Sequence, residues 1–120
     1  MRHNTIRVGI ISKEAYKQRT IAIAKGEYKP NKTDPKIWFE SLLSMAQILS
    51  NENRELLRII QESKPKSLGE LEELSGRKKS NLSRTLKTLE NYGIVELKKE
   101  RNRLMPIVNA TNFEVTVSVA

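Results

Sequence analysis

The sequence predicts an α+β fold that is mainly α-helical, and three observations lead to this prediction. Leucines recur at helical spacing in two adjacent segments, 67–75 and 80–92. The formal charge changes from −2 over residues 66–76 to +6 over residues 77–103. An alternating segment that begins at Ile94 follows directly, as in a β-strand. We therefore expect an acidic helix, a tight turn, a basic helix and a strand.

The first of these helices has clear start and stop signals. Ser67 can cap its N-terminus, and Glu70, three residues later, can reach back to complete a capping box. Gly76 can supply the left-handed residue that ends the helix. Its apolar side is expected to consist of Leu68, Leu71 and Leu74.

The second helix is amphipathic and ends at a glycine. We expect Ser80 to be its N-cap and Gly93 to close it. Residues 94–98 and 104–108 should then form a hairpin with a charged tip at 99–103, in which Pro106 requires an edge position. The buried face should be Leu82, Leu86 and Leu89, with Asn81, Ser83, Arg84 and Lys87 projecting elsewhere.

This order of elements is typical of a winged helix-turn-helix, in which the second helix enters the major groove of DNA. Side chains at the start of that helix would read base edges, and cations around it would contact phosphates. Wing cations would contact the backbone or the minor groove. The expected base contacts are Ser80, Asn81 and Arg84, the expected phosphate contacts are Arg77, Lys78, Lys79, Ser83 and Lys87, and the wing contacts are Lys98, Lys99, Arg101 and Arg103.

Simpler interpretations stand beside these. Asn81 and Ser83 are also residue types that satisfy backbone amides at a helix start, and a basic run is often only solvated surface. The phasing of the charge against the helical pattern favours a polyanion-facing surface. Trp38, the single tryptophan, is expected to anchor the core rather than to stack on a ligand.

The flanking segments predict an N-terminal strand-helix extension. Residues 5–11 should form a strand, and Ser12 should cap a helix that runs to about residue 25. Asp34-Pro35 predicts a helix over 34–49, and Ser50 predicts another over 51–62. Residues 113–119 alternate as a strand, whose expected partner is the N-terminal strand of the same chain or of a second one. We expect residues 1–50 to serve as a dimer or partner interface and residues 51–120 to bind DNA.

Composition restricts the class of protein. The net charge of +8 favours a polyanionic partner. The chain has no cysteine, no apolar run of membrane-spanning length and no hydrophobic N-terminal leader, so we expect a cytoplasmic protein without membrane contact. An enzyme is not expected, because His3 is the only histidine and Glu72 and Glu73 point to different sides of a helix. Neither metal-ligand spacing nor a phosphate-binding loop occurs, so no cofactor is expected.

Several segments carry a resemblance to a known family. They are Ile6-Arg7-Val8-Gly9-Ile10, Tyr16 with Arg19 to Gly26, Lys36-Ile37-Trp38-Phe39, Ser50 to Arg54, and Ser80 to Gly93. Over nearly its whole length the chain resembles small prokaryotic transcriptional regulators with a MarR-like winged helix, many of which look like antitoxins of toxin–antitoxin modules. The resemblance implies DNA binding, autorepression and direct contact with a cognate toxin protein.

The function predicted from the sequence is a DNA-binding transcriptional regulator, a repressor or autorepressor. It would act as a homodimer on double-stranded DNA, because one helix buries too little surface for tight specific binding and paired half-sites are the usual remedy. The alternative is a winged-helix module for protein–protein interaction, in which the basic face is incidental. RNA binding is a third hypothesis. It is less favoured because few aromatic side chains lie outside core positions, where they could stack on bases.

Overall fold

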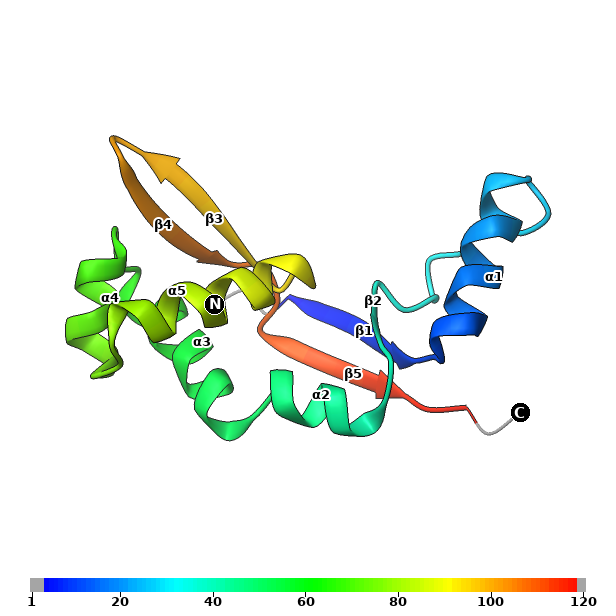
Figure 1. The fold of residues 1–120 in the computed structure, drawn as a ribbon, viewed down its shortest axis with the longest axis horizontal. Helices are drawn as coiled ribbons and strands as arrows, with labels where there is room; N and C mark the ends of the chain where they lie inside the picture. Colours follow the sequence, from blue (N-terminus) through cyan, green and yellow to red (C-terminus); the bar gives the residue numbers. More distant parts are fainter. Residues whose placement is uncertain (1–3, 119–120) are drawn as a thin grey trace.

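The computed structural model describes residues 4–118 as an α+β protein in which five helices accompany two small sheets. His3 and Val119 lie outside the described residues. The molecule is elongated, 47 × 30 × 29 Å, with the β3–β4 hairpin near one end and α1 at the other (Figure 1). The elements are β1 Thr5–Ile10, α1 Lys13–Ala24, β2 Ile37–Phe39, α2 Leu42–Ile48, α3 Asn51–Ser63, α4 Leu68–Ser75, α5 Lys79–Asn91, β3 Val95–Glu100, β4 Arg103–Val108 and β5 Asn112–Thr116.

The first sheet joins the two ends of the described chain. Its strand order is β2-β1-β5, and β1 runs parallel to both neighbours. Val8 lies opposite Ile37 on one side and opposite Val115 on the other. The predicted pairing of the N-terminal and C-terminal strands is therefore confirmed within one chain. Residues from both 1–50 and 51–120, the two predicted functional regions, share this sheet.

Gly9 in the central strand has a packing role. It pairs with Trp38 in β2, and a side chain at this position would collide with the Trp38 ring and with Pro35. A residue without a Cβ is thus required for the indole to lie across the strand. Trp38 is half-buried there, which fits its expected role as an anchor.

Helices α3, α4 and α5 and the hairpin β3–β4 enclose the main core. Leu56 and Ile60 of α3 are buried, together with leucines from the other two helices. The Phe39 and Tyr92 rings, 4.7 Å apart between centroids, join the end of α5 to β2. No helix within residues 4–118 combines the length and apolar character needed to cross a membrane.

The predicted helix over 34–49 is wrong in its first half. Ile37–Phe39 instead forms β2, because these β-branched and aromatic side chains pair with β1 and two of them are buried. The helix begins only at Leu42, where Ser41 accepts a hydrogen bond from the Ser44 N–H at 3.0 Å. The Asp34-Pro35 start signal was therefore overridden by strand pairing with a distant segment.

Other predicted helix starts are confirmed, with one difference in detail. Ser12, Ser50 and Ser67 each accept a hydrogen bond from the backbone three residues later. Glu70 does not complete the expected capping box, because its carboxylate accepts the N–H of Lys66 rather than that of Ser67. On the apolar side of the same helix, Leu74 remains about half exposed (49%).

The predicted C-terminal strand is shorter than expected, and its apolar side chains are only partly covered. β5 ends at Thr116. Phe113 packs against the core, whereas Val115 and Val117 are exposed. Helix α1 is also thinly packed and has no fully buried residue, with Tyr16 and Ile21 among its exposed apolar side chains. Apolar surface thus remains open toward the α1 end of the molecule.

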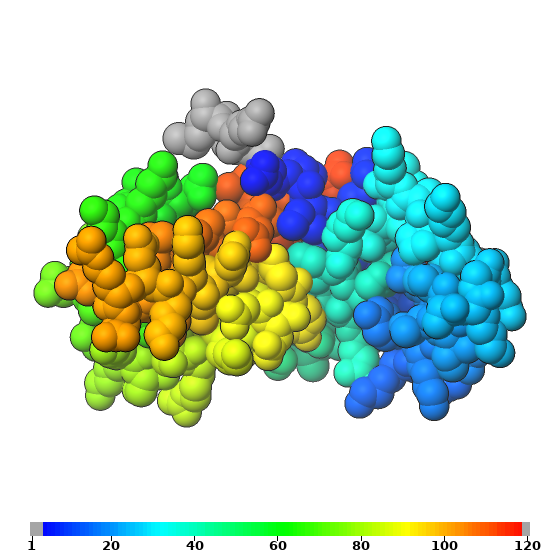
Figure 2. All heavy atoms as spheres, turned by 90° about the horizontal axis from the view of Figure 1, so that it is seen from above, coloured from blue at the N-terminus to red at the C-terminus, as the bar shows by residue number. Residues whose placement is uncertain are grey.

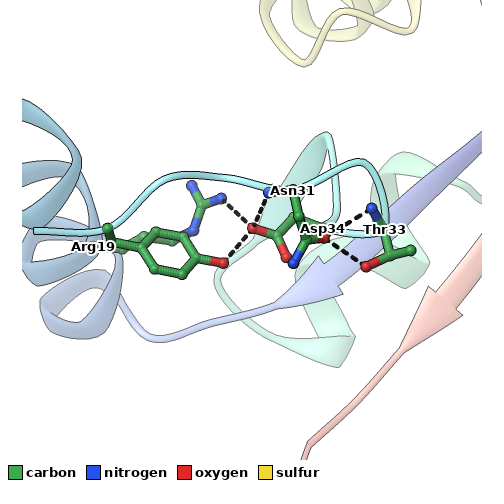
Figure 3. Close-up of polar contacts among 5 residues, drawn as sticks. Arg19, Asn31, Thr33 and Asp34 are labelled. Carbon is green, nitrogen blue, oxygen red and sulfur yellow. Dashed lines mark hydrogen bonds and ion pairs between the residues drawn. The ribbon is translucent and has the colours of Figure 1, made fainter. Parts of the chain in front are cut away.

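A cluster around Asp34 ties α1 to the connector 25–36 (Figure 3). The Asp34 carboxylate accepts hydrogen bonds from the Tyr28 hydroxyl and the Arg19 guanidinium, the latter at 3.4 Å. The same guanidinium lies 5.1 Å from the Trp38 ring centroid and 5.7 Å from that of Tyr28. This cation–π and ion-pair contact fastens an otherwise loosely packed helix to the sheet.

Acid is expected to loosen this cluster before the core unfolds. The Tyr28 hydroxyl, helped by Arg19, lowers the pKa of the Asp34 carboxyl below its ordinary value. A carboxyl with a depressed pKa stabilises the fold above its unfolded pKa and loses that contribution as the pH falls through the folded value. We therefore expect the fluorescence of Trp38 to change below about pH 4.

The matched control is Asp34→Asn, which removes the titrating group and should abolish this acid transition. The Tyr28 hydroxyl donates to Asp34, which raises the pKa of Tyr28 above its ordinary value, so the cluster should persist to pH 10. Identical acid titrations for wild type and Asp34→Asn would contradict the assignment.

Candidate nucleic-acid interface

Helix α5 has one buried and one exposed face. Leu82, Leu86 and Leu89 are completely buried, which confirms the predicted apolar face. The 3.6-residue period places the remaining side chains outward. The exposed residues of the helix and its preceding turn include Lys78, Lys79, Ser80, Asn81, Ser83, Arg84 and Lys87. The structure therefore brings these predicted contacts together on one surface.

The start of α5 is not capped by Ser80, contrary to the prediction. The helix begins at Lys79, and Lys78 occupies the cap position without a side-chain hydrogen bond. The Glu72 carboxylate of α4 instead accepts the Lys79 N–H at 2.8 Å. A carboxylate at this site satisfies one of the free amides and opposes the positive end of the helix dipole. Ser80 consequently lies in the first turn with its hydroxyl on the surface.

The turn between α4 and α5 is tight. Gly76 ends α4 with a φ of 72°, as predicted. The Ser75 hydroxyl then accepts the Arg77 N–H at 3.2 Å, which directs the chain toward α5. The turn comprises residues 76–78, so Lys78 is presented beside the first residues of α5.

Arg77 differs from the other predicted contacts because it is half-buried and strongly bonded within the protein. Its Nε and Nη2 donate to the Asn81 Oδ1 at 2.9 and 2.7 Å. Nη2 also donates to the Thr85 hydroxyl at 3.0 Å, and Nη1 to the Asn53 Oδ1 at 3.4 Å. The side chain therefore joins α3 to α5. Asn53 and Thr85 were not recognised from sequence, because neither residue has a distinctive motif of its own.

The surface near the start of α5 is hollowed, and its charge is mixed. Arg77, Lys78 and Arg84 line this hollow together with Glu52 and Glu55 from α3. Arg58 lowers the pKa of the Glu55 carboxyl through a hydrogen bond, and it also pairs with Glu62. The Glu55 carboxylate thus pairs with a neighbouring cation on α3. Ser75, Ser80 and Asn81 complete the lining.

The hairpin β3–β4 carries the remaining predicted contacts. Its turn contains only Arg101 and Asn102, both with positive φ (48° and 65°), and is therefore narrower than the predicted tip over 99–103. Such turns match the twist of a two-stranded ribbon. Pro106 pairs with Leu97 in a strand that has only one neighbour, as predicted for a proline-containing edge strand.

The hairpin cations do not form one row. Lys98 and Lys99 are consecutive in β3 and therefore point to opposite faces of the ribbon. Arg101 and Arg103 line a hollow together with Lys66, a cation that precedes α4 and was not among the predicted contacts. Lys98, Lys99, Arg101 and Arg103 are all exposed. Of the hairpin cations, Arg101 and Arg103 thus share one surface with Lys66, and Glu100 lines the same hollow.

Within residues 4–118, no group of three or more His, Cys, Asp or Glu side chains is arranged to hold a metal ion. A mostly apolar hollow of about 280 Å³ lies between α3 and residues 108–113, with Leu57 and Phe113 in its lining and Arg54 and Arg58 beside them. The lining of this hollow includes no residue from the start of α5 and none from the hairpin turn.

Comparison with known proteins assigns the chain to a family. A family model, HVO_A0114, matches residues 48–115, which is more than half of the chain. The chain belongs to the HVO_A0114 family. The segment shared with the HVO_A0114 model runs from α3 through β4 and includes β5 except its last residue. The candidate interface therefore lies inside the region that defines the HVO_A0114 family, whereas α1, β1 and β2 lie outside it. No curated protein and no solved structure matched the chain.

The cap on α5 gives a stability prediction. Replacing Glu72 with alanine removes the acceptor of the Lys79 N–H and should lower the free energy of unfolding by about 0.5–2 kcal/mol. Chemical denaturation followed by circular dichroism measures this change. Glu73→Ala, at the neighbouring exposed carboxylate, is the matched control and should stay within about 0.5 kcal/mol of wild type. Equal losses for the two variants would argue against the cap.

Proposed function

We propose that the protein is a sequence-specific DNA-binding transcriptional regulator, a repressor or autorepressor that acts in the cytoplasm. In this proposal α4 and α5 form a helix-turn-helix, α5 is the recognition helix, and β3–β4 is the wing. The observation that carries it is the division of α5: three leucines completely buried, and an outward face with Lys79, Arg84 and Lys87 exposed. A protruding polar and cationic helix is what major-groove reading requires.

The charge and the hairpin support the same proposal. The net charge is +6 over residues 77–103, which comprise the end of the turn, α5, β3 and the hairpin turn up to the first residue of β4. Such a surface lowers the free energy of binding to phosphates by releasing counterions from DNA. The hairpin turn with Arg101 protrudes at the same end of the molecule as α4 (Figure 2 shows the hairpin in orange). A wing at this place would contact the DNA backbone beside the recognition helix.

The contribution of single cations can be measured directly. Replacing Arg84 with alanine should weaken binding to a duplex from the promoter of the protein's own gene by about 1–3 kcal/mol, because a base contact is lost. Lys87→Ala should weaken binding less, and should reduce the slope of log K against log salt by about 0.9 through loss of one phosphate contact. Fluorescence anisotropy at several salt concentrations measures both effects.

Lys64→Ala, an exposed lysine at the end of α3 that lies outside residues 1–50 and outside the predicted contacts, is the matched control and should leave affinity unchanged. Undiminished duplex binding by the double variant Arg84→Ala, Lys87→Ala would refute the assignment of α5 as the recognition helix. Absence of duplex binding by the wild type would refute the DNA-binding proposal itself. That second outcome would favour the other candidate, a protein-interaction module, for which the exposed apolar residues Leu43, Val115 and Val117 are the supporting observation.

We further propose that the protein acts as a homodimer, with residues 1–50 in the interface or in contact with a cognate toxin. The exposed apolar side chains of α1 and of the start of α2 support this placement, with Leu42 and Leu43 exposed by 53% and 68%. The toxin itself rests on the resemblance to antitoxin-like regulators. A second copy would supply the second half-site contact that specific binding needs.

Sedimentation velocity tests the dimer. At micromolar concentration the wild type should sediment as a dimer, and Leu43→Glu should shift the population toward monomer, because a charge would then be buried in the interface. Glu40→Gln, an exposed position near the same helix, serves as the control. A wild-type monomer under these conditions would remove the dimer from the proposal.

A further inference from the structure

The amide of Asn81 has a fixed orientation. Arg77 donates two hydrogen bonds to it, at 2.9 and 2.7 Å. A guanidinium has only donors, so the atom that faces Arg77 must be the amide oxygen and not the nitrogen. The orientation of an asparagine amide is otherwise ambiguous, but here the chemistry of the partner decides it.

Arg77 is in turn held from two other elements. It donates to the Thr85 hydroxyl on α5 at 3.0 Å and to the Asn53 Oδ1 on α3 at 3.4 Å. The Asn53 Nδ2 donates to the Ile48 carbonyl at 3.0 Å, which keeps the Asn53 oxygen toward Arg77. Four of the five guanidinium N–H groups thus have acceptors inside the protein. At most one N–H remains for a phosphate, the contact expected for this residue from the sequence.

The fixed amide determines what Asn81 can offer to a base. An amide oxygen has two lone pairs, and Arg77 takes both. The exposed side chain therefore presents only its two N–H donors. Bidentate reading of adenine requires one donor and one acceptor, since adenine offers N7 and the N6 amino group. Guanine offers the acceptors N7 and O6, and thymine offers O4, so these keto bases match a donor-only side chain.

We propose that Arg77 is a specificity-determining positioning residue, which sets Asn81 to read a keto base, guanine or thymine, in the major groove. This inference rests on the proposed function. Arg77 acts through Asn81 rather than by touching the base itself. Its removal should therefore alter the choice of base at one position of the binding site and leave the choice at other positions unchanged.

The experiment is selection of bound duplexes from a randomised pool by the full chain, followed by sequencing. Asn81→Ala identifies the position that Asn81 reads, because preference there is lost. At that position the wild type should prefer a keto base over adenine by at least about fivefold.

The Arg77 variants test the positioning role. Arg77→Met keeps the length of the side chain but frees the Asn81 oxygen, and should shift the preference at this one position toward adenine. Arg77→Lys, which keeps a single charged donor, should restore part of the keto preference. Arg84→Ala is the control and should alter a different position.

The outcomes separate the two proposals. No enrichment and no duplex binding by the wild type would overturn the proposed function and this inference with it. Enrichment of a sequence with adenine at the Asn81-dependent position would overturn the inference alone. So would an Asn81→Ala variant whose selected sequence equals that of the wild type, or an Arg77→Met variant with an unshifted preference and a native circular dichroism spectrum. If the Arg77→Met variant fails to fold, the wild-type preference tests the inference: a keto base at the Asn81-dependent position supports it, and adenine overturns it.

Discussion

Burial of the leucine face of α5 is the constraint on which the rest of the structure depends. Leu82, Leu86 and Leu89 reach zero exposure because α3, α4 and the hairpin close around them. Their loss from water contributes roughly 1.5–3 kcal/mol for each side chain. Once that face points into the core, the helical period determines the directions of the remaining α5 side chains. The rotation of α5 about its axis, and so the surface that it presents, follows from the core.

The turn before α5 adds finer control to this orientation. Glu72 binds the first amide of the helix, and Arg77 joins Asn53 on α3 to Asn81 and Thr85 on α5. Both contacts use side chains that composition alone would class as ordinary surface charges. The leucines set the rotation of α5, and the Glu72 and Arg77 contacts then set the orientation of its polar side chains. A rigid polar surface of this kind costs less conformational entropy on binding than a mobile one.

Local signals in the sequence predicted the helical part well and the sheet less well. Ser50, Ser67 and Gly76 are decisive because capping and left-handed turns involve only neighbouring residues. The Asp34-Pro35 signal gave a wrong prediction because Ile37–Phe39 becomes a strand by pairing with β1. Each paired residue lies 29 positions earlier in the chain, and no local pattern records such a pairing. The start of α5 was displaced for a similar reason, since Glu72 supplied the cap from another helix. The exposed surface of α5 was predictable, but the bonding of Arg77 was not, because it requires Asn53 to be placed first.

The position of β1 between β2 and β5 bears on how the chain folds. Thr5 pairs with Asn112, so this contact closes a loop of nearly the whole chain. Loop closure of this length is slow relative to helix formation and local hairpin closure. The helices and the hairpin can form from local segments, whereas β1 can pair with β5 only after residues 112–116 have been synthesised. Until then β1 has an unpaired edge, and any other extended segment that reaches it first competes with β5. We therefore expect the pairing of β1 with β5 to follow formation of the helices and the hairpin.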